Sequence, residues 1–354
     1  MDIHIVEDGA FDEIAAREGH REDLAVQGRY GVKNIKYFLN LPEKKIFCLM
    51  EAADKKACVD MHMSAHGIGA CNVIEVSSEI DFGAFFGAGG KDENDMALTS
   101  SGEIDTGYRT LMMVSLIDFT GKNGKHIKEV RKLIQQYQGS NINQPNNHIM
   151  ACFVYASDAI ACCLAVCRLL KNIQTSVDYT MALVTGKPVD ETGSDFFGEA
   201  QGRLQMLCSI GGNQTVHVDM DTEALLQKNF NKSDKARGIV KLVSNGDFNM
   251  FEILWKALEF QISNADFKSE DLNKTIGLSK AQAYRKIKAL TGMSPNELIR
   301  EIRLRKSLEA LKENDKTVAE IAYNLGFNSP TYFTRVFRNR YKVLPTTFAK
   351  LYSA

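Results

Sequence analysis

The chain carries AYRKIKALTGMSPNELIREIRLRKSLEAL at residues 283–311 and TVAEIAYNLGFNSPTYFTRVFRNRYKVLP at residues 317–345, and these two stretches share one pattern. Several positions recur at an offset of fifty residues: Ser279, Ala283, Arg285, Ile287, Gly292 and Pro295 correspond to Ser329, Phe333, Arg335, Phe337, Lys342 and Pro345. A constant offset over so many positions indicates that one supersecondary unit occurs twice.

The second copy has the start and stop signals of two short helices. Thr317 and Glu320 have the spacing of a capping box, and Gly326 is a residue of the kind that ends a helix. Ser329 and Pro330 then begin another helix, with an N-cap and a proline at the first position. Apolar residues recur at helical spacing within both segments: Val318, Ile321, Ala322 and Leu325, then Phe333, Val336 and Phe337. The pattern predicts a helix-turn-helix unit.

The first copy follows the same plan. Gly277 marks its turn, and Ser279 caps a helix whose inner face is apolar. Residues 296–311 have helical periodicity without a breaker, so this segment is expected to hold the two units at a fixed separation. The outer faces of the two second helices are rich in cations and small polar groups, which is the geometry that enters a DNA groove.

The charge distribution supports this interpretation. Residues 260–354 contain 17 Lys+Arg and 9 Asp+Glu, a net charge of +8, whereas the whole chain has a net charge of −1. The first 259 residues therefore carry −9. A basic module attached to an acidic body is what binding to phosphates predicts, whereas a plain helical bundle with a solvated basic face is the alternative.

Both stretches resemble the DNA-binding domain of AraC/XylS-family transcription regulators, over about the last 85 residues. The resemblance implies contacts with double-stranded DNA from the outer faces of two recognition helices: Ala281, Tyr284, Arg285 and Lys288 in the first, Pro330, Thr331, Arg335 and Arg338 in the second. One position departs from the family. Lys342 stands where glycine is usual, so the lysine must adopt a positive φ or the turn must change.

Residues 1–76 have the order β-α-β-β-α-β, which predicts a ferredoxin-like α+β unit. His62 and His66 are four residues apart on the second helix, so both rings project from one face, and Cys71 follows. Imidazole and thiolate favour Ni²⁺ or another late first-row divalent ion. The alternative is a pair of half-exposed histidines near a helix end, with Cys71 in the core.

The same unit resembles a small ferredoxin-like family that includes nickel-binding proteins, on the His-x-x-x-His-Gly helix end and on RYGVKNIKYFL upstream. The resemblance implies a dimeric α+β barrel with a transition-metal site. His62 and His66 would be ligands, Cys71 a further one, and His4 a weaker candidate.

Residues 77–107, rich in Gly, Ser, Asp and Asn, read as a linker or mobile loop. Residues 108–229 again suggest a βαββαβ core, which resembles the catalytic domain of class III nucleotide cyclases on the stretch MALVTGKPVDETGSDFFGEAQGRLQML. Ser115 and Asn147 align with the two metal-binding aspartates of that family. Because neutral side chains hold divalent ions poorly, the prediction is an inactive cyclase-like module that senses or dimerises. Residues 230–265 are expected to form a linker helix that carries Trp255 and leads into an all-α domain at 266–354.

The composition places the chain among cytoplasmic proteins. No apolar run approaches the length of a membrane span, and the acidic N-terminus lacks the plan of a signal peptide. The eight cysteines show no disulfide spacing, which fits a reducing compartment.

The leading interpretation is a homodimeric transcription regulator without catalytic residues, whose first 229 residues sense a metal ion or small ligand. The alternatives are a nucleotide cyclase with a fused helix-turn-helix module, and a metal-buffering protein that DNA binding merely localises.

Overall fold

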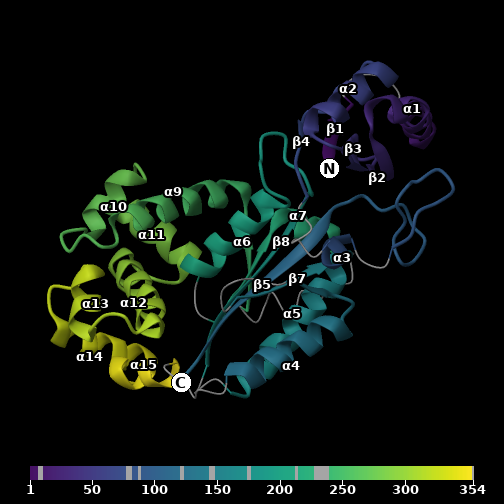
Figure 1. Ribbon diagram of the computed structural model, residues 1–354. Coiled ribbons are helices and arrows are strands. Elements are labelled where there is room, and N and C mark those ends of the chain that lie inside the picture. Colours follow the sequence, from purple (N-terminus) through teal and green to yellow (C-terminus); the bar gives the residue numbers. More distant parts are fainter. Residues whose placement is uncertain are drawn as a thin grey trace.

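A computed structural model describes residues 1–6, 11–76, 82–86, 89–119, 123–142, 148–173, 177–211, 214–226 and 239–352 (Figure 1). The first unit contains β1 (Asp2–Ile5), α1 (Glu13–Val26), β2 (Lys33–Asn40), β3 (Lys45–Glu51), α2 (Lys55–Ala65) and β4 (Asn72–Val73). Its antiparallel sheet has the order β2-β3-β1-β4. This order confirms the predicted ferredoxin-like arrangement, and Asp54 caps α2 as an N-cap residue that accepts a hydrogen bond from the backbone of Ala57.

The described part of the expected linker is packed rather than extended into solvent. Residues near Met96 run along the edge of β2, where the backbone nitrogen of Tyr37 donates to Asp95 and that of Ala97 donates back to Tyr37. Short helix α3 (Phe82–Phe86) inserts two buried rings, and Phe85 stacks on Phe197 of the second unit at 5.0 Å. Phe86 also packs on Phe38 of the first unit, so these apolar residues tie the start of the expected linker to both units.

The second unit is a six-stranded sheet of order β10-β9-β8-β5-β7-β6. Its elements are β5 (Arg109–Asp118), α4 (Asn123–Gln136), β6 (Ser140–Ile142), β7 (His148–Phe153), α5 (Ala156–Lys171), β8 (Val177–Gly186), α6 (Gly198–Ile210), β9 (Val216–Asp219), α7 (Met220–Leu225) and β10 (Val240–Val243). Alternate residues of β5 face opposite layers: Met112 and Val114 pack with α4 and α5, whereas Leu111 and Met113 pack with α6 and α9. The α+β class expected for this part is confirmed.

The last third is entirely helical among its described residues. It contains α9 (Asn245–Gln261), α10 (Ser269–Thr275), α11 (Lys280–Thr291), α12 (Pro295–Glu313), α13 (Val318–Asn324), α14 (Pro330–Tyr341) and α15 (Pro345–Tyr352). Capping boxes form at Ser279, Ser294 and Thr317. The double helix-turn-helix predicted from the repeat is therefore confirmed.

Helix α12 joins the two helix-turn-helix units. Its first half, including Leu298 and Ile302, packs in the same core as Ala283 and Ile287 of α11. Its second half packs in a separate core with Phe333 and Phe337 of α14. The buried leucines that α12 contributes to this second core are Leu304, Leu308 and Leu311. Nineteen residues of helix span about 28 Å, which sets the separation of the two units.

Charged and aromatic contacts fix the helical domain to the second unit. The guanidinium of Arg305 donates to the carbonyl oxygens of Cys208, Ser209 and Gly211, at 3.2, 2.7 and 3.0 Å, where α6 ends. Phe119, just after β5, stacks on Tyr341 of α14 with ring centres 5.1 Å apart. The helices and the sheet thus form one continuous body in Figure 1.

Lys342 ends α14 in the left-handed region, with φ 64°, and Gly292 ends α11 in the same way, with φ 77°. The turn is therefore preserved, and the lysine adopts the positive φ. An L-residue with a Cβ pays a steric cost in this region that glycine avoids.

Lys342→Gly should therefore increase the free energy of unfolding by about 1 kcal/mol. Lys342→Ala is the matched control, because it removes the same side-chain contacts and keeps the Cβ. Denaturant unfolding followed by circular dichroism measures both. Equal stabilities for the glycine and alanine variants would contradict the assignment of strain to this residue.

Candidate nucleic-acid interface and metal centre

The first recognition helix, α11, turns its expected contact residues to solvent. Ser279 accepts a hydrogen bond from the backbone of Gln282, which starts the helix, and the inner residues Ala283 and Ile287 are fully buried. Helical periodicity then leaves the opposite face outside. All four of its predicted contact residues are exposed: Ala281, Tyr284, Arg285 and Lys288.

The second recognition helix, α14, is positioned in the same way by Phe333 and Phe337, which are buried. Thr331, Arg335 and Arg338 are exposed, and Pro330 is half-buried. These residues line a shallow hollow of about 560 Å³ together with Thr334, Asn339 and Leu344. Asn339 and Leu344 were absent from the predicted set, because they lie past the end of the outer stripe that the spacing defined.

The cations on these faces have few acidic partners. Within the described part of the chain, Arg285, Arg335 and Arg338 form no ion pair with a carboxylate. Arg335 lies over the ring of Tyr332 at 5.3 Å, and Lys288 is 3.7 Å from Glu297. Unpaired guanidinium groups on an exposed helix face can make bidentate hydrogen bonds to guanine or to phosphate.

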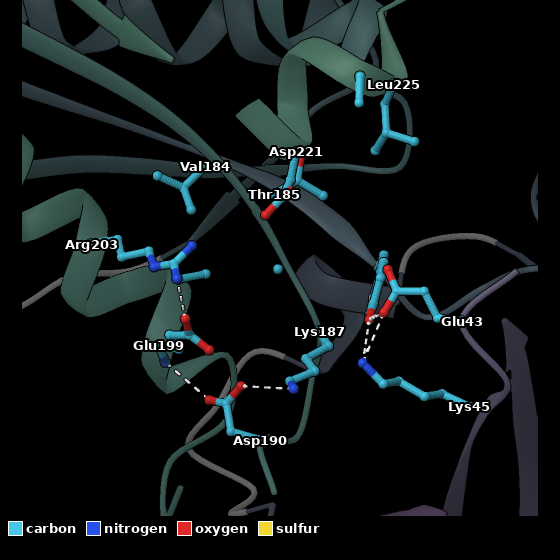
Figure 2. A pocket seen from close by; sticks show the side chains of 14 residues that line it. Glu43, Lys45, Val184, Thr185, Lys187, Asp190, Glu199, Arg203, Asp221 and Leu225 are labelled. Carbon is cyan, nitrogen blue, oxygen red and sulfur yellow. Dashed lines mark hydrogen bonds and ion pairs between the residues drawn. The ribbon is translucent and has the colours of Figure 1, made fainter. Parts of the chain in front are cut away.

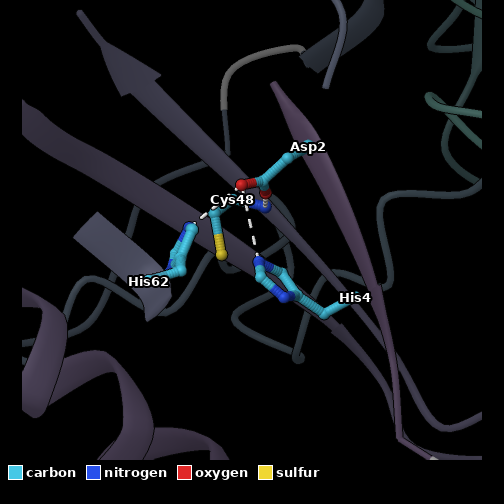
Figure 3. Close-up of side chains that lie close together, drawn as sticks. All are labelled: Asp2, His4, Cys48 and His62. Atoms are coloured by element: carbon cyan, nitrogen blue, oxygen red, sulfur yellow. Dashed lines mark hydrogen bonds and ion pairs between the residues drawn. The ribbon is translucent and has the colours of Figure 1, made fainter. Parts of the chain in front are cut away.

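The first unit buries a cluster of titratable side chains between β1 and α2. His62 is fully buried, with Nδ1 2.9 Å from Asp23 Oδ1 and Nε2 3.0 Å from Asp2 Oδ2. His4 Nε2 lies 3.4 Å from the same Asp2 oxygen, as Figure 3 shows. Cys48, on β3, completes the group, and its backbone nitrogen donates to Asp2 Oδ1 at 3.1 Å.

Two sets of potential ligand atoms result. Asp2, His4, Cys48 and His62 each offer one atom, all within 4.8 Å of one another and all buried. A second set contains Asp23, His62 and His66, in which Asp23 Oδ1 lies 3.3 Å from His66 Nε2. Cys71 is exposed and belongs to neither set. The predicted trio is therefore brought together only in part, and neither histidine is free on a solvent face.

Three members of the cluster were missed from the sequence: Asp2, Asp23 and Cys48. Each comes from a different element, at separations from His62 that carry no motif. The alternation of β1, which turns Asp2 and His4 to the same side, was the only available signal.

The electrostatics of the cluster favour a proton on His62. Burial lowers the pKa of His62, but its hydrogen bonds with Asp2 and Asp23 outweigh burial and raise the pKa to about 9. Against the effect of burial, His4 and then His62 lower the pKa of Asp2, and His62 and His66 lower that of Asp23. Burial and the neighbouring aspartates raise the pKa of the Cys48 thiol. At neutral pH the centre of this cluster is an imidazolium between two carboxylates.

The donor set fits a transition metal once protons are lost. His4 Nε2 is buried and, within the described part of the chain, has only the 3.4 Å contact with Asp2 Oδ2, so this ring nitrogen could bind an ion. Imidazole, carboxylate and thiolate together suit a late first-row ion rather than Mg²⁺ or Ca²⁺. Loss of the proton from His62 Nε2 would free this nitrogen and the facing Asp2 oxygen for the same ion.

A separate cavity of about 400 Å³ lies between the β2–β3 hairpin and the second unit (Figure 2). Three of its carboxylates are paired with cations: Glu43 with Lys45, Asp190 with Lys187 and Glu199 with Arg203. Ser115, expected at a cyclase metal position, lies in another cavity, whereas Arg203 of the cyclase-like helix lines this one. Asn147 lies outside the described residues. The described residues of the cyclase-like pattern do not converge on one site.

Comparisons with known proteins match the two ends of the chain. Residues 272–351 match the family of the helix-turn-helix domain, and residues 1–76 match that of the nickel responsive protein SCO4226-like. The transcriptional regulator MtrA of Neisseria gonorrhoeae is 37% identical over 73 residues, 21% of this chain and 24% of MtrA. The probable transcription factor PqrA of Proteus vulgaris is 31% identical over 101 residues, 28% of this chain and 83% of PqrA.

The DNA-binding domain of AdpA, solved with a target DNA, is 27% identical, with 28% of this chain and 89% of that chain covered and a TM-score of 0.27. This chain spans less than a third of the length of MtrA. Among the described residues, no helix combines the length and apolar character that a membrane crossing requires.

The buried imidazolium gives the metal-free protein a specific pH dependence. A histidine whose pKa is raised on folding stabilises the fold fully below its unfolded pKa of about 6.5, and this stabilisation is lost as the pH rises through about 9. The free energy of unfolding should therefore fall between pH 7 and pH 9, by on the order of 1–3 kcal/mol.

His62→Gln should abolish most of this slope, because glutamine keeps hydrogen bonds to the aspartates without a titrating proton. Chemical denaturation at several pH values, with a chelator present, measures the slope. Parallel pH profiles for the wild type and His62→Gln would show that His62 is not the responsible group.

Proposed function

Because the chain belongs to the AraC-type helix-turn-helix transcription regulators, we propose that it binds a specific operator in double-stranded DNA through α11 and α14. The observation that supports this best is the presence of two recognition helices joined by α12, with Arg285 on α11 and Arg335 and Arg338 on α14 exposed and forming no ion pair among the described residues. Their separation of about one helix length fits two successive major grooves on one face of the duplex, roughly 10 bp apart.

Within this proposal, the predicted contacts divide into two kinds. Arg285 and Arg335 are placed to read base edges, together with Ala281, Tyr284, Pro330 and Thr331. Lys288 and Arg338 lie further along each helix and are assigned to phosphates. Base contacts determine sequence preference, whereas phosphate contacts contribute affinity for any sequence.

Arg285→Ala and Arg335→Ala should each weaken operator binding by about 1–3 kcal/mol and relax selectivity at one base step. Lys288→Ala and Arg338→Ala should weaken binding to all sequences and reduce the salt slope by about one. Fluorescence anisotropy with an operator selected from a random duplex library measures both effects.

Lys256→Ala is the matched control, because Lys256 is exposed and belongs to α9 rather than to either recognition helix. It removes one positive charge and should leave affinity nearly unchanged. Operator affinity equal to the wild type in both arginine variants would refute the assignment of the recognition helices.

We also propose that the first unit binds Ni²⁺ or another late first-row divalent ion at Asp2, His4, Cys48 and His62. The match of residues 1–76 to a nickel-responsive family and the buried N, O and S donor set support this. Such an ion would supply positive charge that replaces the protons of His62 and Cys48. His66 lies next to this group, in contact with Asp23. A Cys71 variant tests the alternative ligand set of His62, His66 and Cys71.

Calorimetric titration of Ni²⁺ into the full chain should show affinity that increases from pH 6.5 to pH 9, with protons released, because His62 must lose its proton. His62→Ala and His4→Ala should remove most of the heat. His126→Ala, which alters a histidine outside the group, is the control. Equal heats from the wild type and His62→Ala would refute the site, and a loss of binding in Cys71→Ala would favour the alternative set.

The remaining parts of the proposal concern the whole molecule. We assign residues 108–229 a sensing or dimerising role without catalysis, since the cyclase-like residues lie in separate cavities. Large apolar side chains are exposed on the helical side of the first unit: Ile14, Met63 and Ile68. They support a homodimer, and the chain would act in the cytoplasm.

A further inference from the structure

A cavity of about 530 Å³ lies where the helical domain meets the second unit, and neither the DNA interface nor the metal centre uses it. Its floor is the end of the sheet, with Ser115 on β5 paired to His148 on β7. The end of α6 and helices α9 and α12 form the walls. Cavities between domains are preferred places for small ligands.

Two basic side chains of the lining, His148 and Lys312, form no ion pair with a carboxylate among the described residues. His148 Nδ1 is buried and has no hydrogen-bond partner among the residues that the structure describes. Within the described residues, Lys312 forms no ion pair with a carboxylate, and its ammonium lies 4.8 Å from the ring centre of Tyr352. Burial lowers the pKa of both groups, and Lys312 further lowers that of His148. An anion placed between them would pair with the ammonium of Lys312 and accept a hydrogen bond from His148.

The acidic residues of the lining do not fill this role. Glu259, Glu309 and Glu313 are exposed, so they lie at the rim. Asp178 is buried but is held by Arg340 of α14, at 2.5 Å. The ammonium of Lys312 and the ring nitrogen of His148 are therefore open to an anionic ligand, whose binding would favour the protonated form of His148.

The rest of the lining is apolar and includes an aromatic ring. Trp255 on α9 is half-buried, and Ile302 and Leu308 of α12 are buried beside it. We propose that this cavity binds a small organic anion: an acidic group between His148 and Lys312, and an aromatic or aliphatic body against Trp255.

The position of the cavity gives binding a consequence for the helical domain. Ile302 and Leu308 line it, and the same residues belong to the separate cores of the first and second helix-turn-helix units. A ligand in contact with both residues moves α12 or restricts its movement. Because α12 sets the separation of α11 and α14, the ligand then affects that separation. This consequence, unlike the binding itself, rests on the proposed function.

The single tryptophan of the chain provides a local reporter. Titration of 8-anilinonaphthalene-1-sulfonate, an aromatic sulfonate, into the full-length protein should quench Trp255 in a saturable manner, with energy transfer to the dye. Trp255→Phe should abolish the transfer and retain dye emission under direct excitation.

Lys312→Met and His148→Gln should each weaken binding about tenfold or more, as expected for loss of a hydrogen bond to a charged group. Lys316→Met, an exposed lysine that does not line the cavity, is the control and should match the wild type. Far-ultraviolet circular dichroism verifies that each variant is folded, and either cavity variant alone suffices if the other unfolds.

Three results would overturn the proposal: no saturable quenching of Trp255, unchanged affinity in both cavity variants, or equal affinity for the uncharged analogue N-phenyl-1-naphthylamine. The assay contains no DNA and no metal, so its outcome is independent of the proposed function. The consequence for α12 is tested separately, by operator affinity with and without the dye. Unchanged operator affinity at saturating dye would overturn that consequence alone.

Discussion

The arrangement of the whole molecule depends on a small buried network around Arg340. Its guanidinium contacts Glu301 of α12 at 2.8 Å and Asp178 of β8 at 2.5 Å, and Glu301 also accepts from Arg305 at 3.2 Å. Despite burial, these contacts raise the pKa of Arg340 and lower that of Glu301. Removal of one partner from such a group leaves an uncompensated charge, at a cost of about 3–5 kcal/mol. The second helix-turn-helix unit, α12 and the sheet are thereby fixed to one another.

The same body extends continuously to the buried cluster around His62. One hydrophobic core contains Ile3 of β1, Phe197 before α6, Leu254 of α9 and Ile299 of α12. Asn72 on β4 donates to two carbonyl oxygens of the second unit, at 2.6 and 2.7 Å. The charge at His62 and the position of α12 are therefore linked through packed elements. A displacement at one end would have to be accommodated by contacts that the other end shares.

Local rules of sequence were sufficient for the helical domain. Caps at Ser279 and Thr317, the glycine turns and the 3.6-residue apolar period involve residues within a few positions of one another, and all appear in the structure. At Lys342 the sequence left two outcomes open, a positive φ or a changed turn, and the structure has the positive φ. The element order of the first unit followed from the same kind of pattern, whereas β10 of the second sheet lies in the stretch 230–265 that was expected to be a linker helix.

The sequence by itself thus determined the family, the element order and the outward faces of α11 and α14, because each rests on short-range periodicity. Only the tertiary structure placed Asp2 and Asp23 on either side of His62, at separations of 60 and 39 residues. It also decided that Arg340 and Asp178, 162 residues apart, would meet, and that Asp178 would line a cavity together with Trp255. Charges are paired by proximity in space, and long-range proximity leaves no period or spacing in a single chain.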